Sequence, residues 1–173
     1  LWDIFLWDRN ASPKIKLVSV SSTGVQKNQG NESTSRIVAP AISADGGIIA
    51  YSTTATNLVP GDTNGLQDVF VHQVSTAVTI RASEGTGGVQ ATGDSPVGQG
   101  ERVALSSDGT WVAFTTAAAN ISAGGSNVMI HNNFTDETIA ITANAANFSG
   151  SKGPALSGDG RFVAFMSGAQ LDP

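Results

Sequence analysis

Three short segments of the chain share one pattern, a Ser-x-Asp-Gly tetrapeptide followed closely by four apolar residues. The tetrapeptides contain Asp45, Asp108 and Asp159. The apolar runs after them are Ile48–Tyr51, Trp111–Phe114 and Phe162–Phe165. Asp-Gly between two apolar runs predicts a β-hairpin, because glycine adopts positive φ without steric cost. One hairpin of two antiparallel strands is therefore expected in each copy.

A second pair of β-rich runs is associated with these hairpins. Residues 68–73 align with 127–132 and with 3–8 near the start of the chain. Each is followed by another run rich in Val, Ile and Thr, at 77–83, 138–143 and 15–20 respectively. These runs are too short for helices, and no segment has a sustained 3.6-residue period. One repeat is thus predicted to contain four strands, and the protein to be all-β.

Repetition of a four-stranded unit predicts a β-propeller rather than a sandwich. A sandwich also uses many short strands, but it does not repeat one strand order with one motif. The Gly-, Ser- and Asn-rich tracts 21–35 and 84–100 are expected to be surface loops that join successive repeats. Enlarged loops of this kind account for a repeat longer than in an ordinary propeller. The predicted fold class is an all-β propeller with four-stranded blades.

The repeats divide the chain into about three blade equivalents within a single propeller segment, 1–173. Residues 1–20 are a half-blade, 36–83 and 101–143 are complete blades, and 154–167 are the complementary half-blade. Because propellers have four to eight blades, three are too few for a closed ring. Two explanations stay open: the chain is a piece of a larger propeller, or copies complete each other's half-blades, two chains giving six. An open solenoid or another fold is a further alternative.

The most regular repeat resembles a known family. Ser43–Gly46 and its apolar run, then Ala55–Gly65 and Asp68–Val71, resemble the WD-like β-propeller repeats related to the C-terminal domain of TolB. In the next repeat Ser122–Ser126 replaces the Asp-containing loop. The resemblance implies that the segment is part of a six-to-eight-blade ring and that it is a bacterial, exported interaction platform with no inherent chemistry. A non-enzymatic protein-interaction or structural scaffold is therefore expected, with a carbohydrate-binding or glycan-processing propeller and a self-assembling surface or fibre subunit as alternatives.

Composition narrows the classes of partner. Charged residues make up 13% of the chain and the net charge is -5. Because the nine basic residues are scattered, no nucleic-acid groove is expected. Without cysteine there are no disulfides or thiolate metal sites. No stretch has the roughly 18 consecutive apolar residues of a membrane-spanning helix. The Ser-, Thr-, Gly- and Asn-rich composition favours an extracytoplasmic protein, periplasmic or secreted, whose export signal is not present in this chain.

One loop carries the only candidate metal ligands. Asp62, Asn64 and Asp68 place three oxygen-bearing side chains within seven positions of a Gly-containing loop. Calcium prefers such oxygen ligands, but Leu66 occupies the fifth position of an EF-hand-like alignment and no Glu occupies the twelfth. The alternative is that Asp62 and Asn64 make side-chain-to-backbone turn bonds and Asp68 begins a strand. No other cofactor is expected.

Histidine and tryptophan give weaker signals. His72 and His131 occupy equivalent places in two repeats, with Trp7 as the third equivalent, and a structural role is expected for them. Trp111 is expected in the core, whereas Trp2 is free to stack on a sugar ring. No Gly-x-Ser-x-Gly elbow is present for a serine nucleophile. The sequence therefore predicts no catalytic site.

Overall fold

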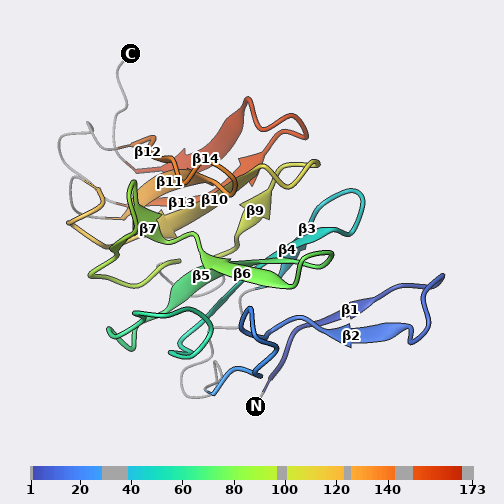
Figure 1. Ribbon diagram of the computed structural model, residues 1–173. Helices are drawn as coiled ribbons and strands as arrows, with labels where there is room; N and C mark the ends of the chain where they lie inside the picture. Colours follow the sequence, from blue (N-terminus) through green and yellow to red (C-terminus); the bar gives the residue numbers. More distant parts are fainter. Residues whose placement is uncertain (1, 29–38, 97–100, 123–125, 143–149, 169–173) are drawn as a thin grey trace.

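The computed structural model describes residues 2–28, 39–96, 101–122, 126–142 and 150–168 (Figure 1). Every regular element in these ranges is a β-strand, as the short Val-, Ile- and Thr-rich runs predict. The part of the chain so described contains no helix long and apolar enough to cross a membrane.

The strands form two four-stranded antiparallel sheets and three two-stranded ones. The first complete sheet consists of β3 (Ala41–Ile42), β4 (Ile48–Thr53), β5 (Asp68–Gln73) and β6 (Val78–Arg81). The second consists of β9 (Ala104–Leu105), β10 (Trp111–Thr116), β11 (Asn127–Asn132) and β12 (Thr138–Ala140). The two-stranded sheets are β1 (Phe5–Trp7) with β2 (Ile15–Leu17), β7 (Glu84–Gly85) with β8 (Val89–Gln90), and β13 (Ser151–Leu156) with β14 (Val163–Ser167).

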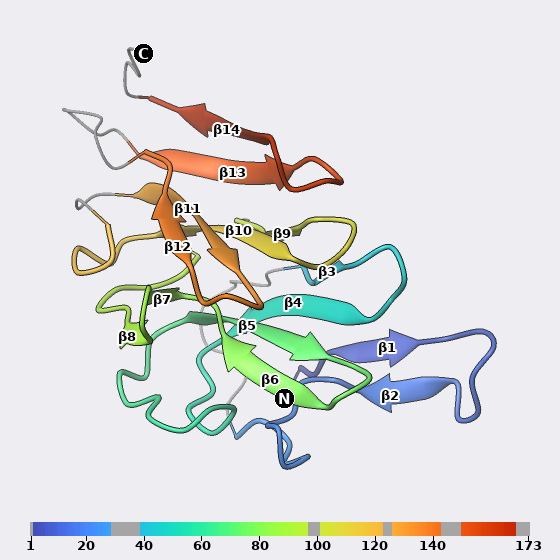
Figure 2. The same cartoon turned by 45° about the horizontal axis from the view of Figure 1, so that its top comes forward.

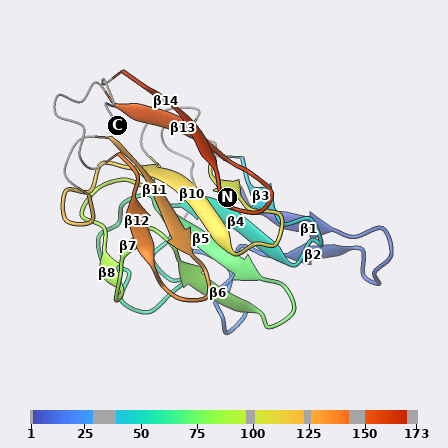
Figure 3. The same cartoon turned by 90° about the horizontal axis from the view of Figure 1, so that it is seen from above.

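The sheets follow one another in chain order. Figure 2 shows the pair β1–β2 in blue and the pair β13–β14 in red at opposite ends of a stack, with the two complete sheets between them. In the view from above, strands of successive sheets overlap (Figure 3). One core cluster, which includes Ile48, Val71 and Phe114, lies between the two complete sheets. The other, which includes Val18 and Tyr51, lies between β1–β2 and the first complete sheet. Each sheet is thus stabilised by burying apolar side chains against its neighbours, as in repeat proteins.

The three Ser-x-Asp-Gly segments form three equivalent turns. In the first, the Ser43 hydroxyl donates to Asp45 Oδ1 at 2.6 Å, and the Gly47 amide donates to the same oxygen at 2.8 Å. The Ile48 amide donates to Ser43 Oγ at 2.9 Å and starts strand β4. Gly46 has a φ of 73°, the left-handed conformation that only glycine adopts readily. The hairpin predicted from Asp-Gly is confirmed. The serine hydroxyl adds two bonds to it, one to the aspartate and one from the first amide of the next strand.

The same bonds recur at the other two turns. Ser106 and Ser157 donate to Asp108 and Asp159, both at 2.6 Å. These hydroxyls, together with backbone amides, lower the pKa of Asp45 and of Asp159, and they lower the pKa of Asp108 to about 2. The three aspartates are therefore anionic turn residues at neutral pH. A hydroxyl that donates to a carboxylate favours the charged form.

The turns also connect one sheet to the next. The Ala44 amide donates to the Ser107 carbonyl, and the Ser107 amide donates to the Gly158 carbonyl, both at 2.8 Å. At two of the turns, glycine is required by a close approach as well as by φ. A Cβ on Gly109 would lie 2.5 Å from Ile48 Cγ1, and one on Gly160 would lie 2.6 Å from Trp111 Cδ1. Glycine therefore allows each turn to pack directly on the preceding sheet.

Several strands are shorter than the sequence suggests. Strands β3 and β9 contain two residues each, and the strand expected over 15–20 is only Ile15–Leu17. The blade expected over 36–83 extends into 36–38 and the run expected over 138–143 into 143, which lie outside the described residues. The tract 84–100, expected to be a loop, contains the hairpin β7–β8, because Gly87 and Gly88 both take positive φ and allow a tight turn.

Candidate functional site

The loop that precedes β5 holds the three candidate calcium ligands. Asp62 and Asp68 are both buried, the latter completely. Asp62 Oδ1 accepts from the Gln90 amide at 3.1 Å, and Asp68 Oδ1 accepts a short bond from the Ser83 hydroxyl. Within the described ranges, the second carboxylate oxygen of each aspartate is buried and has no partner at hydrogen-bond geometry, although the Asn64 side chain helps to lower the pKa of Asp68. These two free oxygens are the part of the loop that fits a cation best.

Asn64 takes part in the loop itself. Its Oδ1 accepts from the Leu66 amide at 2.9 Å, and its Nδ2 donates to the Ala91 carbonyl at 2.9 Å. These are the side-chain-to-backbone bonds that the turn interpretation expects. They tie the loop to the segment after β8. Of the three candidate ligands, Asn64 is thus the one whose oxygen already has a backbone donor.

Positive charge reaches this site from Arg81 at the end of β6. Its guanidinium lies 3.2 Å from Glu84 Oε2, while its Nε and Nη1 are buried without a partner. Burial raises the pKa of Asp62 and raises that of Asp68 to about 6, and the Arg81 charge lowers both. The Asp62 charge raises the pKa of Asp68 further. Arg81 therefore provides part of the neutralising charge that a bound cation would supply.

The contacts of Asp68 recur at the start of the equivalent strands. Ser83 Oγ bonds Asp68 and accepts from the Val69 amide. The matching pairs in the other sheets are Thr142 with Asn127, at 3.0 Å, and Ser19 with Asp3, at 2.8 Å. In all three repeats, a hydroxyl about 15 residues further along the chain donates to the acid or amide side chain near the start of the strand. This hydrogen bond joins that strand to the segment that follows the next one. Asp68 has this structural role whether or not the loop binds calcium.

No three His, Asp or Glu side chains among the described residues form a group able to hold a metal ion. Asp62 and Asp68 interact, while Asn64 bonds the backbone around it. Sequence reasoning identified these three residues and missed Arg81 and Ser83. The signal for Ser83 was present in the sequence, since Thr142 follows Asn127 at the same spacing. The calcium site stays a prediction.

The two histidines connect neighbouring sheets. His72 Nδ1 pairs with Thr79 Oγ1 at 2.9 Å, and the Thr79 hydroxyl donates to the Val20 carbonyl at 2.6 Å. His131 pairs in the same way with Thr138, at 2.9 Å, and the Thr138 hydroxyl donates to the Glu84 carbonyl. Because each threonine hydroxyl donates to a carbonyl, it accepts from its histidine, which fixes the proton on Nδ1. Burial lowers the pKa of both imidazoles. Each histidine thus holds a threonine of its own sheet, and that threonine bonds the preceding segment of the chain, as a repeated structural feature.

The tryptophans differ in exposure. Trp2 and Trp7 are exposed, whereas Trp111 is half-buried beneath the turn at Gly160. The expectation that Trp111 belongs to the core is wrong, because its side chain is only half-buried and belongs to neither core cluster. Trp2 stays available for stacking, as the sequence suggests.

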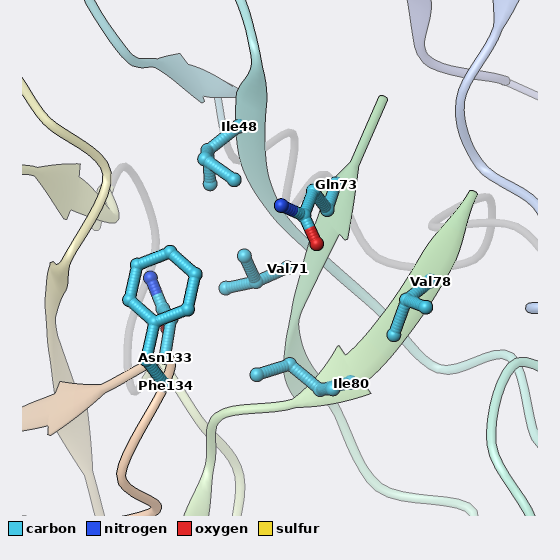
Figure 4. Close-up of a pocket in the computed structure, with 7 residues that line it drawn as sticks. All are labelled: Ile48, Val71, Gln73, Val78, Ile80, Asn133 and Phe134. Atoms are coloured by element: carbon cyan, nitrogen blue, oxygen red, sulfur yellow. The ribbon is translucent and has the colours of Figure 1, made fainter. Parts of the chain in front are cut away.

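Two hollows lie on the described surface. A narrow cleft of about 50 Å³ separates the first complete sheet from the β11–β12 turn, where the ring of Phe134 faces Ile48, Val71 and Ile80 (Figure 4). This volume is far below the roughly 300 Å³ of a small-molecule pocket. The cleft is therefore part of the packing between sheets.

The second hollow is an open depression of about 340 Å³. Its lining mixes hydroxyl, amide and apolar groups from two segments and consists of Ser21, Ser22, Thr23, Val25, Asn57, Leu58, Val59 and Pro60. Leu58 is buried, while Val25 is 55% exposed at the rim. The two segments are joined by an Asn57 amide that donates to the Gln26 carbonyl at 2.9 Å. Nothing in the sequence pattern indicated this depression, because it arises from two loops about 30 residues apart.

Comparison with known proteins adds a likeness of fold. No protein-family model matches the chain, and its sequence matches no curated protein. The crystal structure of TolB from Acinetobacter baumannii is similar, with a TM-score of 0.50 and 16% identity over 94% of this chain and 31% of that one. A complex of KlAtg21 with the coiled coil of AgAtg16 aligns over 74% of this chain and 36% of that one, with a TM-score of 0.43 and 16% identity.

The chain thus spans about a third of the length of the TolB chain. At this identity the likeness concerns the fold alone. The arrangement of small antiparallel sheets in sequence order agrees with it. The chain therefore has a fold similar to the β-propeller fold of TolB.

Proposed function

We propose that the chain is a non-enzymatic scaffold that binds another protein, and that the depression around Val25 is a contact surface. The observation that carries the proposal is the lining of this depression. The Ser21 and Ser22 hydroxyls already bond within the chain, to Thr23 and Thr79. The exposed Thr23 hydroxyl can bond a peptide backbone, and the apolar groups of Val25, Val59 and Pro60 can cover an apolar side chain. Protein-binding surfaces combine apolar contacts with polar groups that form hydrogen bonds.

We further propose that the chain supplies three blade equivalents of a six-to-eight-blade propeller, in an extracytoplasmic setting. Two complete four-stranded sheets and two pairs with complementary strands support this blade count. The low content of charged residues, 13%, supports the setting.

Peptide binding tests the scaffold proposal. Peptides selected from a displayed random library on the immobilised chain should bind saturably in fluorescence anisotropy. Val25→Arg should weaken binding at least tenfold, since it places a charge on an apolar rim, and tenfold corresponds to about 1.4 kcal/mol. The matched control is Met166→Arg on β14, a residue that is also exposed and lies at the other end of the stack.

Equal loss in both variants, or no saturable peptide, would contradict the proposal. Binding on a glycan array that depends on Trp2, with no peptide bound, would instead favour the carbohydrate-binding alternative. Trp2 is 74% exposed and so can be replaced without disturbing the fold.

A further inference from the structure

Two strands at opposite ends of the stack each have one unused edge. Among the described residues, β14 pairs only with β13, and β1 pairs only with β2. In the complete sheets, the equivalent strands are paired on both sides. Exposed strand edges readily accept another strand. These two edges are called the β14 edge and the β1 edge below.

The complete sheets show what covers such edges. The turn before β14 is equivalent to those before β4 and β10, and β1 aligns with β5 and β11. Strand β4 pairs antiparallel with β5 over six residues, and β10 pairs with β11 over six in the same register. A β14 edge therefore fits a β1 edge. The register transferred from β4–β5 is Phe162 opposite Asp8, Ala164 opposite Leu6 and Met166 opposite Ile4.

Burial at equivalent positions supports this match. In β4, Ile48 and Ser52 are 6% and 3% exposed, whereas their equivalents Phe162 and Met166 are 60% and 65% exposed. On the other strand, Phe70 and His72 of β5 are fully buried, whereas the equivalent Phe5 and Trp7 of β1 are exposed. The half-sheets thus present large apolar side chains where the complete sheets bury theirs.

The turns give a second and independent match. Turn amides donate from Ala44 to Ser107 and from Ser107 to Gly158, each to the next sheet along the chain. Among the described residues, the amide of Gly158 in the third turn has no acceptor, and the carbonyl of Ala44 in the first turn has no donor. The third turn of one copy could therefore donate a hydrogen bond to the first turn of another.

Two of the turn glycines also contact the sheets in chain order, each lying against a residue of the preceding sheet. Gly109 packs against Ile48, and Gly160 packs against Trp111. Gly46 meets only Ile42 of its own hairpin, at 4.0 Å, although it has the same φ. Phe162 is the residue equivalent to Ile48 and Trp111, and it is exposed. The turn at Gly46 thus fits over Phe162 as the other turns fit over their neighbours.

We propose that a second copy of this chain docks head to tail, so that its β1 edge pairs with the β14 edge and its Gly46 turn covers Phe162. Both contacts belong to one rigid placement, because β1–β2 and the first complete sheet already pack together within a copy. The interface continues the sheet-to-sheet contact inside the chain. Two copies together contain four complete sheets and two formed from paired half-sheets, and these six blades are within the four to eight of a closed propeller. This inference concerns a different surface from the depression and rests on the blade count proposed above, so that it can fail while peptide binding at the depression holds.

Disulfide trapping tests the register. The chain has no cysteine, so any crosslink comes from introduced residues. Ala164 and Leu6 are equivalent to Ala50 and Val71, which face each other in β4 and β5. The Val74 amide donates to the Gly47 carbonyl, and because hydrogen-bonded pairs alternate along an antiparallel ladder, Ala50 and Val71 form a non-hydrogen-bonded pair. The Cα atoms of such a pair are about 4.5 Å apart, a distance that a disulfide can span. The double variant Ala164→Cys with Leu6→Cys should therefore form a covalent dimer on oxidation.

The matched control is Ala164→Cys with Trp7→Cys. A shift of one residue moves the side chain to the other face of the sheet, so this pair should stay largely monomeric. Equal crosslinking of both pairs, or no crosslinking of the matched pair, would overturn the proposal. Within one copy the two positions lie at opposite ends of the stack and cannot meet (Figure 2).

Sedimentation tests the association and its polarity. The unmodified chain should form a dimer. Met166→Lys and Trp7→Lys should each weaken association at least tenfold, which is about 1.4 kcal/mol, while Val89→Lys, at an exposed site on β8, should not. An equimolar mixture of the two edge variants keeps one unaltered interface and should regain association. A monomer at every accessible concentration, or a mixture that associates no better than either variant alone, would overturn head-to-tail docking.

Discussion

The sheet β9–β12 and the pair β13–β14 contain the same turn between their first two strands, but the side chains of the strand after the turn are buried to different extents. Ser106 and Ser157 make identical bonds to their aspartates, and the amides of Trp111 and Phe162 return to the two serines at the same 2.9 Å. Phe114 is nevertheless completely buried in β10, whereas the equivalent Phe165 in β14 is half-buried. Four local residues therefore suffice to form the turn, while burial depends on the sheets on both sides.

The largest expected difference between these two regions comes from the equivalent phenylalanines. Phe114→Ala removes a fully buried ring and should lower the free energy of unfolding by about 3–5 kcal/mol. Phe165→Ala should cost clearly less in the monomer, because solvent already reaches that side chain. Chemical denaturation of dilute protein measures both. Equal losses would mean that the half-sheet is as well packed as the complete one.

The turn glycines sharpen the comparison. Gly46→Ala and Gly109→Ala place a side chain at the same φ of 73°, which should cost each about 1–2 kcal/mol. Only Gly109→Ala also brings a Cβ to 2.5 Å from Ile48, and this overpacking should add about 1–3 kcal/mol. Denaturation of the two variants in dilute solution gives the difference directly. If they lose the same stability, the second complete sheet does not pack on the first through this turn.

The start of β5 provides a third comparison, between Asp68 and the equivalent Asn127. Burial raises the pKa of Asp68 from 3.8 to about 6, which corresponds to about 3 kcal/mol. Since its folded pKa lies above its unfolded one, the stability that Asp68 contributes is fully present below about pH 4 and is lost as the pH rises through about 6. Asp68→Asn, which copies Asn127, should remove this part of the pH dependence in denaturation curves.

Buffers with and without calcium extend the same experiment. Asp62→Asn serves as the matched variant in the same loop. A calcium-induced rise in melting temperature that both substitutions abolish would support the candidate cation site. An effect of calcium that neither substitution changes would remove it. A decrease in stability between pH 4 and 6 that persists in Asp68→Asn would show that another group causes it.

The sequence supports the local part of this fold better than its packing. The Asp-Gly turns follow from two residues each, and their repetition indicates an all-β stack of four-stranded units. The pairing of turns through Ala44 and Ser107 could not be predicted, because it depends on how far each sheet is rotated from the last. The hairpin β7–β8 was missed because its glycines are equally typical of an irregular loop.

The candidate site shows the same division. Asp62, Asn64 and Asp68 could be selected from spacing, since ligands in one loop are close in sequence. Arg81 could not, because it reaches the loop only through the pairing of β5 with β6. The depression at Val25 depends on two loops from different sheets. Contacts between residues that are far apart in the sequence could therefore be identified only from the structure.

One kind of turn-to-turn contact joins each complete sheet to the sheet that follows it. Residue-resolved amide hydrogen exchange tests it most directly, because each contact includes a single backbone donor. In dilute protein the amides of Ala44 and Ser107 should be protected to similar extents, as both donate across sheets at 2.8 Å, while that of Gly158 should exchange rapidly. Exchange of Ala44 and Ser107 as fast as that of Gly158 would contradict the claim.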